Sequence, residues 1–190
     1  MLKTLSKMLP DKTIHVEPFG DIAPLLCLRE PARNEVYNDM GGGLVGFFRA
    51  MATFNGPTIH APEVVVKQLQ LMYPNIMSSG ELVAVDVADE FNGWRDRFMR
   101  VQIDEIPVLN CIKYWDSEDT LFCIWPPPME QDSMTRWSLY RMILKTKGAV
   151  ALDFRFIKDD QCRQSLLKSK GWKQLSGAWV NPQFGDGNEG

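Results

Sequence analysis

Apolar residues follow two patterns along the chain, short continuous runs and runs at helical spacing. Continuous runs bounded by turn residues are typical of buried strands, and apolar residues at i, i+3 and i+4 are typical of helices. The first pattern predicts strands at 13–17, 35–38, 100–104, 121–124, 148–153 and 172–175. The second predicts helices at 22–28, 44–51, 63–72, 107–114, 134–145 and 161–169. Alternating strands and helices predict an α/β fold with a mostly parallel sheet.

The segment around residues 53–100 is less regular than the rest. Within it, valines at every second position of 81–90 fit a strand, whereas the length also fits a helix, and the pattern leaves both open. Residues 184–190 are rich in glycine and acidic side chains, which is typical of a flexible tail. We therefore expect a single domain over residues 1–183, an insert around 53–100, and a short tail.

Composition narrows the class of protein. The length of 190 residues and the hydrophobic content of 45% suit one folded α/β domain. No apolar stretch approaches the roughly 18 residues of a membrane span, and the first residues are too polar for a signal peptide, so we expect a cytoplasmic protein. A net charge of -3 argues against a broad basic surface for nucleic acid.

Metal binding is not expected. The chain has only two histidines, and its four cysteines form no Cys-x-x-Cys pair. Buried, reduced thiols are the simpler interpretation of cysteines this far apart. The cysteines are Cys27, Cys111, Cys123 and Cys162.

Three segments in a fixed order resemble a known family. They are residues 16–20 (Val-Glu-Pro-Phe-Gly) with 35–39 and 44–49, residues 100–104 with 114–122, and residues 144–150 with 170–172. Together they cover most of residues 13–175 and resemble the Dam-like adenine-specific DNA methyltransferases of the small phage type. The resemblance implies a Rossmann-like fold that binds S-adenosylmethionine at the carboxyl ends of its strands. It also implies that the insert helps to recognise DNA, and it is compatible with a phage-encoded protein in a bacterial host.

The resemblance assigns cofactor contacts to several strand ends. Glu17, Pro18 and Phe19 match the end of the first strand, where the family's acidic residue faces the methionine amino group of the cofactor. Asp39 matches the acid that binds the ribose hydroxyls, although an Asn-Asp pair before glycines also fits a turn. Asp104 matches the acid that contacts the adenine ring, although a cap of the helix at 107–114 is equally compatible.

The chain departs from the family where the chemistry takes place. The family's catalytic segment is Asp-Pro-Pro-Tyr, and this chain has Trp125, Pro126, Pro127 and Pro128 in that place. An indole only donates hydrogen bonds, so Trp125 cannot replace the carboxylate that accepts them from the target amino group. Losing such a group costs roughly 10²–10⁴ in rate. Pro128 has no aromatic face to stack on a flipped base.

Two further departures concern the cofactor. Asp21 and Ala23 stand where the family's turn has glycines that let the backbone approach S-adenosylmethionine. The family's opening Gly-Gly-Lys segment is missing, and Lys7 aligns with the helix that follows it. We therefore expect weakened cofactor binding.

These departures predict a catalytically degenerate homologue, a pseudoenzyme that binds DNA or a protein partner. Because the chain is acidic, a protein partner is favoured. The alternative is an active adenine-specific DNA methyltransferase with an altered motif, in which Trp125 stacks on the base and Glu130 or Asp132 accepts the hydrogen bond. Tryptophans near predicted loops are either interface residues or core anchors; these are Trp94, Trp115, Trp125 and Trp179.

Overall fold

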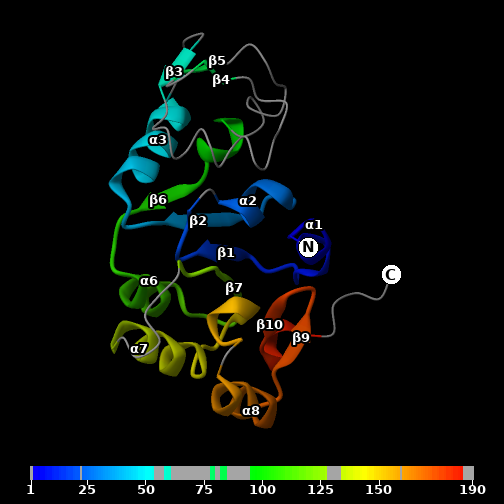
Figure 1. Cartoon of the computed structure of the whole chain (residues 1–190). Helices are drawn as coiled ribbons and strands as arrows, with labels where there is room; N and C mark the ends of the chain where they lie inside the picture. Colours follow the sequence, from blue (N-terminus) through cyan, green and yellow to red (C-terminus); the bar gives the residue numbers. More distant parts are fainter. Residues whose placement is uncertain are drawn as a thin grey trace.

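A seven-stranded sheet with helices on both faces forms the centre of the protein (Figure 1). The computed structural model describes residues 2–21, 23–53, 58–60, 78–79, 82–84, 95–127, 134–158 and 160–185. The strands of this sheet are β1 (Ile14–Glu17), β2 (Asn34–Asn38), β6 (Gln102–Asp104), β7 (Thr120–Ile124), β8 (Ala149–Asp153), β9 (Lys173–Leu175) and β10 (Ala178–Val180).

The order of the strands is β6-β2-β1-β7-β8-β10-β9. From β6 to β8 every neighbouring pair is parallel, and β10 runs antiparallel to both β8 and β9. The chain moves outward from β1 to β2 and β6, and then in the opposite direction from β7 to β8. This reversal creates a topological switch point between β1 and β7, which is where doubly wound sheets bind their ligands. The strand order confirms the expected Rossmann-like fold of S-adenosylmethionine-dependent methyltransferases.

The helices connect successive strands. They are α1 (Leu2–Met8), α2 (Pro24–Leu28), α3 (Gly42–Thr53), α6 (Val108–Trp115), α7 (Met134–Ile143) and α8 (Gln161–Ser169), with short 3-10 turns at Phe154–Phe156 and Pro182–Phe184. A second, antiparallel sheet consists of β3 (Thr58–His60), β5 (Leu82–Ala84) and β4 (Ser78–Ser79). None of the described helices combines the length and hydrophobicity that crossing a membrane requires.

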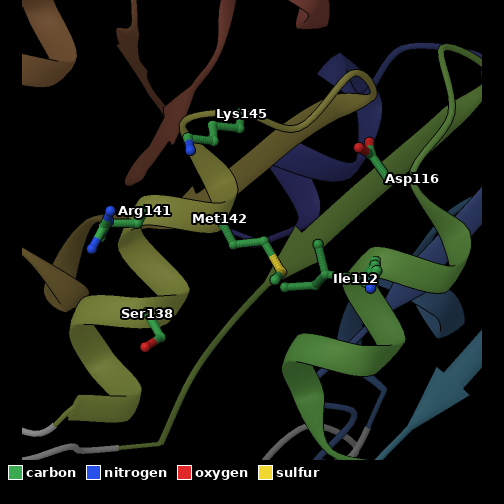
Figure 2. Close-up of a pocket in the computed structure, with 7 residues that line it drawn as sticks. Ile112, Asp116, Ser138, Arg141, Met142 and Lys145 are labelled. Carbon is green, nitrogen blue, oxygen red and sulfur yellow. The ribbon is translucent and has the colours of Figure 1, made fainter.

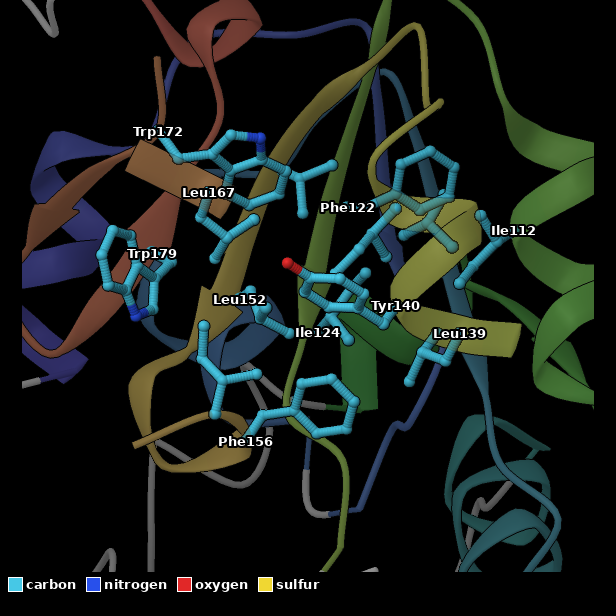
Figure 3. Packing of buried hydrophobic residues seen from close by; sticks show 14 of the residues in the cluster. Ile112, Phe122, Ile124, Leu139, Tyr140, Leu152, Phe156, Leu167, Trp172 and Trp179 are labelled. Atoms are coloured by element: carbon cyan, nitrogen blue, oxygen red, sulfur yellow. The ribbon is translucent and has the colours of Figure 1, made fainter. Parts of the chain in front are cut away.

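The two faces of the central strands carry side chains of different size. Along β8, Ala149 and Ala151 face the helices α1 and α2, in a cluster that includes Leu5 and Leu25. The larger residues of β7 and β8 face α6, α7 and α8 in the cluster of Figure 3, which includes Phe122, Ile124, Val150, Leu152, Tyr140 and Leu167. Because successive side chains of a strand point to opposite faces, this alternation explains why both faces are covered.

Aromatic side chains join the end of the insert to the sheet. Phe98 stacks on Phe48 of α3 with ring centroids 4.3 Å apart, and Phe48 lies 4.8 Å from the ring of Tyr37 on β2. Next to Phe98, Arg97 forms a two-pronged ion pair with Glu35, with N···O distances of 2.6 and 3.0 Å. The last residues of the insert are therefore attached to the core by both packing and charge.

Several expectations from the pattern need correction or completion. Strand β10 was not predicted, and Trp179 at its centre is fully buried, so Trp179 is a core residue and not part of an interface. The pattern left both a strand and a helix open for residues 81–90, and Leu82–Ala84 form a strand. Phe184, assigned to the tail by composition, is buried against the α1 face of the sheet. The helix expected at 63–72 and the residue Trp94 lie outside the described residues.

Candidate functional site

The predicted site residues lie at one edge of the sheet. Glu17 ends β1, Asp39 directly follows β2, Asp104 ends β6, and Trp125 directly follows β7. Register places Asn38 of β2 beside Asp104 of β6. Because these strands are parallel, their carboxyl ends meet on both sides of the switch point. The individual roles of these residues in binding remain predictions.

The turn between β1 and α2 has the backbone geometry of glycines without having glycines. Asp21 and Ala23 have φ angles of 43° and 50°, in the left-handed region that non-glycine residues rarely adopt. For an L-residue this conformation costs roughly 1–2 kcal/mol. These are the two positions at which the resemblance expects glycine. The turn therefore has the conformation that glycines adopt most easily, although these two positions are not glycine.

Hydrogen bonds from β2 hold this turn in place. The Asp21 N–H donates to Oδ2 of Asp39 at 2.9 Å, and the Tyr37 hydroxyl donates to the Asp21 carbonyl at 2.8 Å. The preceding Gly20 must be glycine, because a Cβ there would lie 2.1 Å from the Tyr37 ring. The tyrosine ring thus occupies the space beside the turn.

Asn38 is a positioning residue that the sequence pattern did not single out. Its side chain is fully buried, and its Nδ2 donates to the carbonyls of Pro18 at 3.0 Å and Ile106 at 3.1 Å. Its Oδ1 accepts from the Ile106 N–H at 3.0 Å. One amide therefore ties the end of β1 and the loop after β6 to β2. The available signal was an amide directly after the buried pair Val36 and Tyr37, at the end of the predicted strand.

Both carboxylate oxygens of Asp39 accept hydrogen bonds from backbone N–H groups. Oδ1 accepts from the Gly41 N–H at 2.5 Å, which is the turn-forming contact, and Oδ2 accepts from Asp21. The turn interpretation of Asp39 is therefore observed. Each carboxylate oxygen has a further lone pair, so the predicted contact with ribose hydroxyls is not blocked by these bonds.

Glu17 points into the protein. Its side chain is almost completely buried, and Oε1 accepts a hydrogen bond from the Leu26 N–H in α2. Burial raises the pKa of Glu17 to about 8, and this effect outweighs the bonds from the backbone, which favour the charged form. The carboxyl group is therefore mainly protonated near neutral pH.

A buried histidine lies beside Glu17. His15 Nε2 is 3.8 Å from Glu17 Oε1, and the His15 ring is fully buried. Burial lowers the pKa of His15 well below its usual value, and the nearby Arg29 and Arg97 lower it further. With both groups neutral near pH 7, this contact is not an ion pair. It contributes no charge to the edge of the sheet.

Asp104 does not cap the helix that follows it. Its carboxylate accepts from Gln102 Nε2 at 3.0 and 3.2 Å, whereas α6 begins at Val108 with Pro107 at its N-cap and no side-chain cap hydrogen bond. The capping alternative is therefore wrong. The predicted contact of Asp104 with the adenine ring remains a prediction.

Trp125 packs against the core. Its side chain is half-buried on the α1 face, next to the cluster that contains Leu5 and Leu25. Within the described part of the chain, the buried indole N–H has no hydrogen-bond acceptor. Pro126 is half-buried and Pro127 is exposed, while Pro128, Glu130 and Asp132 lie outside the described residues. The position at which the resemblance implies an acceptor is thus occupied by an aromatic side chain packed against the core.

No known family model and no curated protein sequence matches this chain. Among solved structures, it is similar to SMU.1697c, a candidate methyltransferase from Streptococcus mutans in complex with SAH, at 11% identity and a TM-score of 0.39, with 94% of this chain and 92% of that chain covered. It is also similar to an rRNA methylase from Streptococcus thermophilus, at 10% identity and a TM-score of 0.35, with 79% and 66% covered. The fold assignment itself rests on the strand order of the sheet.

Metal ligands do not gather at this edge. In the residues that the structure describes, no group of three or more histidine, cysteine, aspartate or glutamate side chains is placed to hold an ion. Cys111 and Cys123 are buried, Cys27 is half-buried, Cys162 is exposed, and all four thiols are free.

Proposed function

We propose that the protein is a catalytically degenerate homologue of the adenine-specific DNA methyltransferases, which acts by binding a protein partner or DNA and not by methyl transfer. The observation that carries this proposal is Trp125 at the end of β7. Its indole is anchored among apolar side chains and has no acceptor atom. A target amino group would therefore lack the carboxylate that directs its lone pair toward a methyl donor.

The residues at the edge also fit S-adenosylmethionine poorly. A protonated, inward-facing Glu17 supplies no counter-charge for the ammonium group of the cofactor. At the turn, the carboxylate of Asp21 would repel the carboxylate of the cofactor. Asp39 alone keeps free lone pairs toward ribose hydroxyls. We expect binding to be weaker than at an intact site.

Two measurements on the purified protein test this proposal. Incubation with adenine-containing DNA and labelled S-adenosylmethionine is expected to give no transfer above background. Calorimetry with S-adenosylhomocysteine is expected to give weak binding that Asp39→Ala weakens further. Robust transfer that Asp39→Ala abolishes would overturn the proposal and favour an active enzyme with an altered motif.

A variant with the family's catalytic residue types separates the effect of the catalytic segment from the effect of the turn at Asp21 and Ala23. Trp125→Asp combined with Pro128→Tyr restores the family's catalytic residue types. Transfer by this variant would indicate that the site lacks only these groups. Absence of transfer would assign the deficit to the turn at Asp21 and Ala23 as well, which the further changes Asp21→Gly and Ala23→Gly would test.

The choice between partners follows from charge. The net charge of -3 disfavours a long-range attraction to bare DNA. We therefore expect a gel-shift assay with duplex DNA to show weak binding that is lost with added salt. A tight, salt-resistant complex with duplex DNA would reverse this preference.

A further inference from the structure

A groove between α6 and α7 lies far from the candidate site. Both helices start at the carboxyl edge of the sheet, after β6 and β7, and run back toward the amino edge. The groove is formed near their ends and has a volume of about 380 Å³ (Figure 2). Its lining is Ile112, Lys113, Asp116, Ser138, Arg141, Met142 and Lys145. A ligand here would therefore leave the carboxyl edge accessible.

The floor of the groove is apolar and continuous with the core. Ile112 is buried, and Met142 packs against the same cluster. Figure 2 shows the Met142 thioether lying against Ile112 between the two helices. A methionine adapts its shape to different apolar partners, which suits a groove that accepts side chains from another molecule.

The rim of the groove is cationic. Lys113, Arg141 and Lys145 are all exposed, and no acidic side chain within the described ranges forms an ion pair with any of them. Arg141 lies in the last turn of α7 and Lys145 lies two residues beyond its end, and both line the α7 side of the groove. This cationic rim contrasts with the acidic charge of the whole chain.

The single carboxylate of the groove has a structural role. Asp116 Oδ1 accepts hydrogen bonds from the backbone N–H groups of Lys147 at 2.8 Å and Gly148 at 3.3 Å. It therefore organises the turn that enters β8. Three cations and one carboxylate leave the groove with a positive excess.

We propose that this groove docks an acidic amphipathic segment of a protein partner. Apolar side chains of such a segment would cover Ile112 and Met142, and its carboxylates would pair with the cationic rim. Nucleic acid fits less well, because a phosphate backbone has no apolar side chains to cover the floor formed by Ile112 and Met142. The inference concerns a surface separate from the carboxyl edge of the sheet and does not depend on the proposed loss of catalysis.

Fluorescence anisotropy with three labelled probes tests this inference on the full chain. The probes are a peptide of repeated Glu-Glu-Leu-Leu units, a peptide of repeated Glu-Glu-Ser-Ser units, and a DNA duplex. The leucine peptide is expected to bind at least about tenfold more tightly than the other two, because only it offers both charge and apolar contact.

Charge reversal locates the binding. Arg141→Glu with Lys145→Glu is expected to weaken binding of the leucine peptide by about tenfold or more, and so is Lys113→Glu alone on the opposite wall. The matched control is Lys168→Glu with Lys170→Glu, the same charge change at exposed positions in the last turn and at the C-cap of α8, which should leave binding within about twofold. Urea unfolding of each variant checks that the fold is kept.

Three results would overturn the inference. One is failure of the leucine peptide to bind, and another is equal weakening by the α7 and α8 reversals. The third is a duplex that binds more tightly than the peptide and is released by the α7 reversal, which would assign the groove to nucleic acid. None of these results bears on methyl transfer or on S-adenosylhomocysteine binding at the carboxyl edge of the sheet. The two proposals can therefore fail separately.

Discussion

The protonated state of Glu17 makes a quantitative prediction about stability and pH. Glu17→Gln replaces the carboxyl group by an amide of nearly the same shape, whose carbonyl can still accept from the Leu26 N–H. The folded protein holds the proton of Glu17 up to a pKa of about 8, compared with 4.5 for a free glutamate. The unfolded chain therefore releases a proton that the folded protein keeps between these two values.

The sign and size of the effect follow from proton linkage. Since the folded state binds more protons between pH 4.5 and 8, the free energy of unfolding falls as pH rises through this window. One pKa unit is worth ~1.4 kcal/mol, so the whole window accounts for at most about 5 kcal/mol. His15 acts in the opposite direction only below pH 6.5, because its lowered pKa makes the folded state lose stability as pH falls. Between pH 6.5 and 8 Glu17 is the shifted group that we expect to dominate among the described residues, and it predicts a loss of about 2 kcal/mol.

Urea unfolding followed by tryptophan fluorescence at closely spaced pH values measures this loss. The native protein should lose stability from pH 6.5 to 8, and Glu17→Gln should remove most of the slope. An exposed carboxyl changed in the same way, Glu118→Gln, should leave the slope as it is. Parallel curves for the native protein and Glu17→Gln would refute the reasoning about burial.

Three further changes test the geometry near the carboxyl edge of the sheet, each by urea unfolding. Ala23→Gly should change the stability by less than about 0.5 kcal/mol, because relief of the ~1–2 kcal/mol of left-handed strain offsets the lost burial of the methyl group and the extra freedom of the unfolded chain, whereas the same change at the exposed Ala50 inside α3 should destabilise the protein by about 1 kcal/mol. An equal loss at both positions would contradict the argument from strain. Asn38→Leu should cost about 3 kcal/mol or more, since it leaves three buried backbone groups without partners; a loss below ~1 kcal/mol would show that water or local movement satisfies them. Arg97→Met should cost about 3–5 kcal/mol by leaving Glu35 buried and unpaired, and the double variant with Glu35→Leu should recover much of that loss; a double variant as unstable as the single one would be inconsistent with an unpaired charge as the cause.

The α/β fold could be predicted from the sequence because its elements leave local signals. A continuous apolar run such as Leu121 to Ile124 signals a strand buried on both faces whatever its neighbours are. Alternation of such runs with helical spacing implies parallel strands, and parallel strands bring their carboxyl ends to one edge. The order of strands and helices along the chain was therefore enough to predict that Glu17, Asp39 and Asp104 lie at that edge.

Short elements without a local signal could not be predicted. Strand β10 has three residues and follows Gly177, so its apolar run is too brief to distinguish from a loop. Its burial comes from pairing with β8 and β9. Because this strand was not predicted, the sequence pattern placed Trp179 near a loop.

Sequence by itself thus determined which residue types stand at the strand ends, including an indole where the resemblance to methyltransferases implies an acceptor, because chemistry is a property of the residue. Only the tertiary structure decided what each group does there. The protonation of Glu17 depends on its burial beside α2, and the partial burial of Trp125 depends on its packing against the cluster that contains Leu5 and Leu25. Contacts such as Arg97 with Glu35 join residues 62 positions apart. Such effects arise from burial and distance in the folded protein, and neither is contained in the order of residues along the chain.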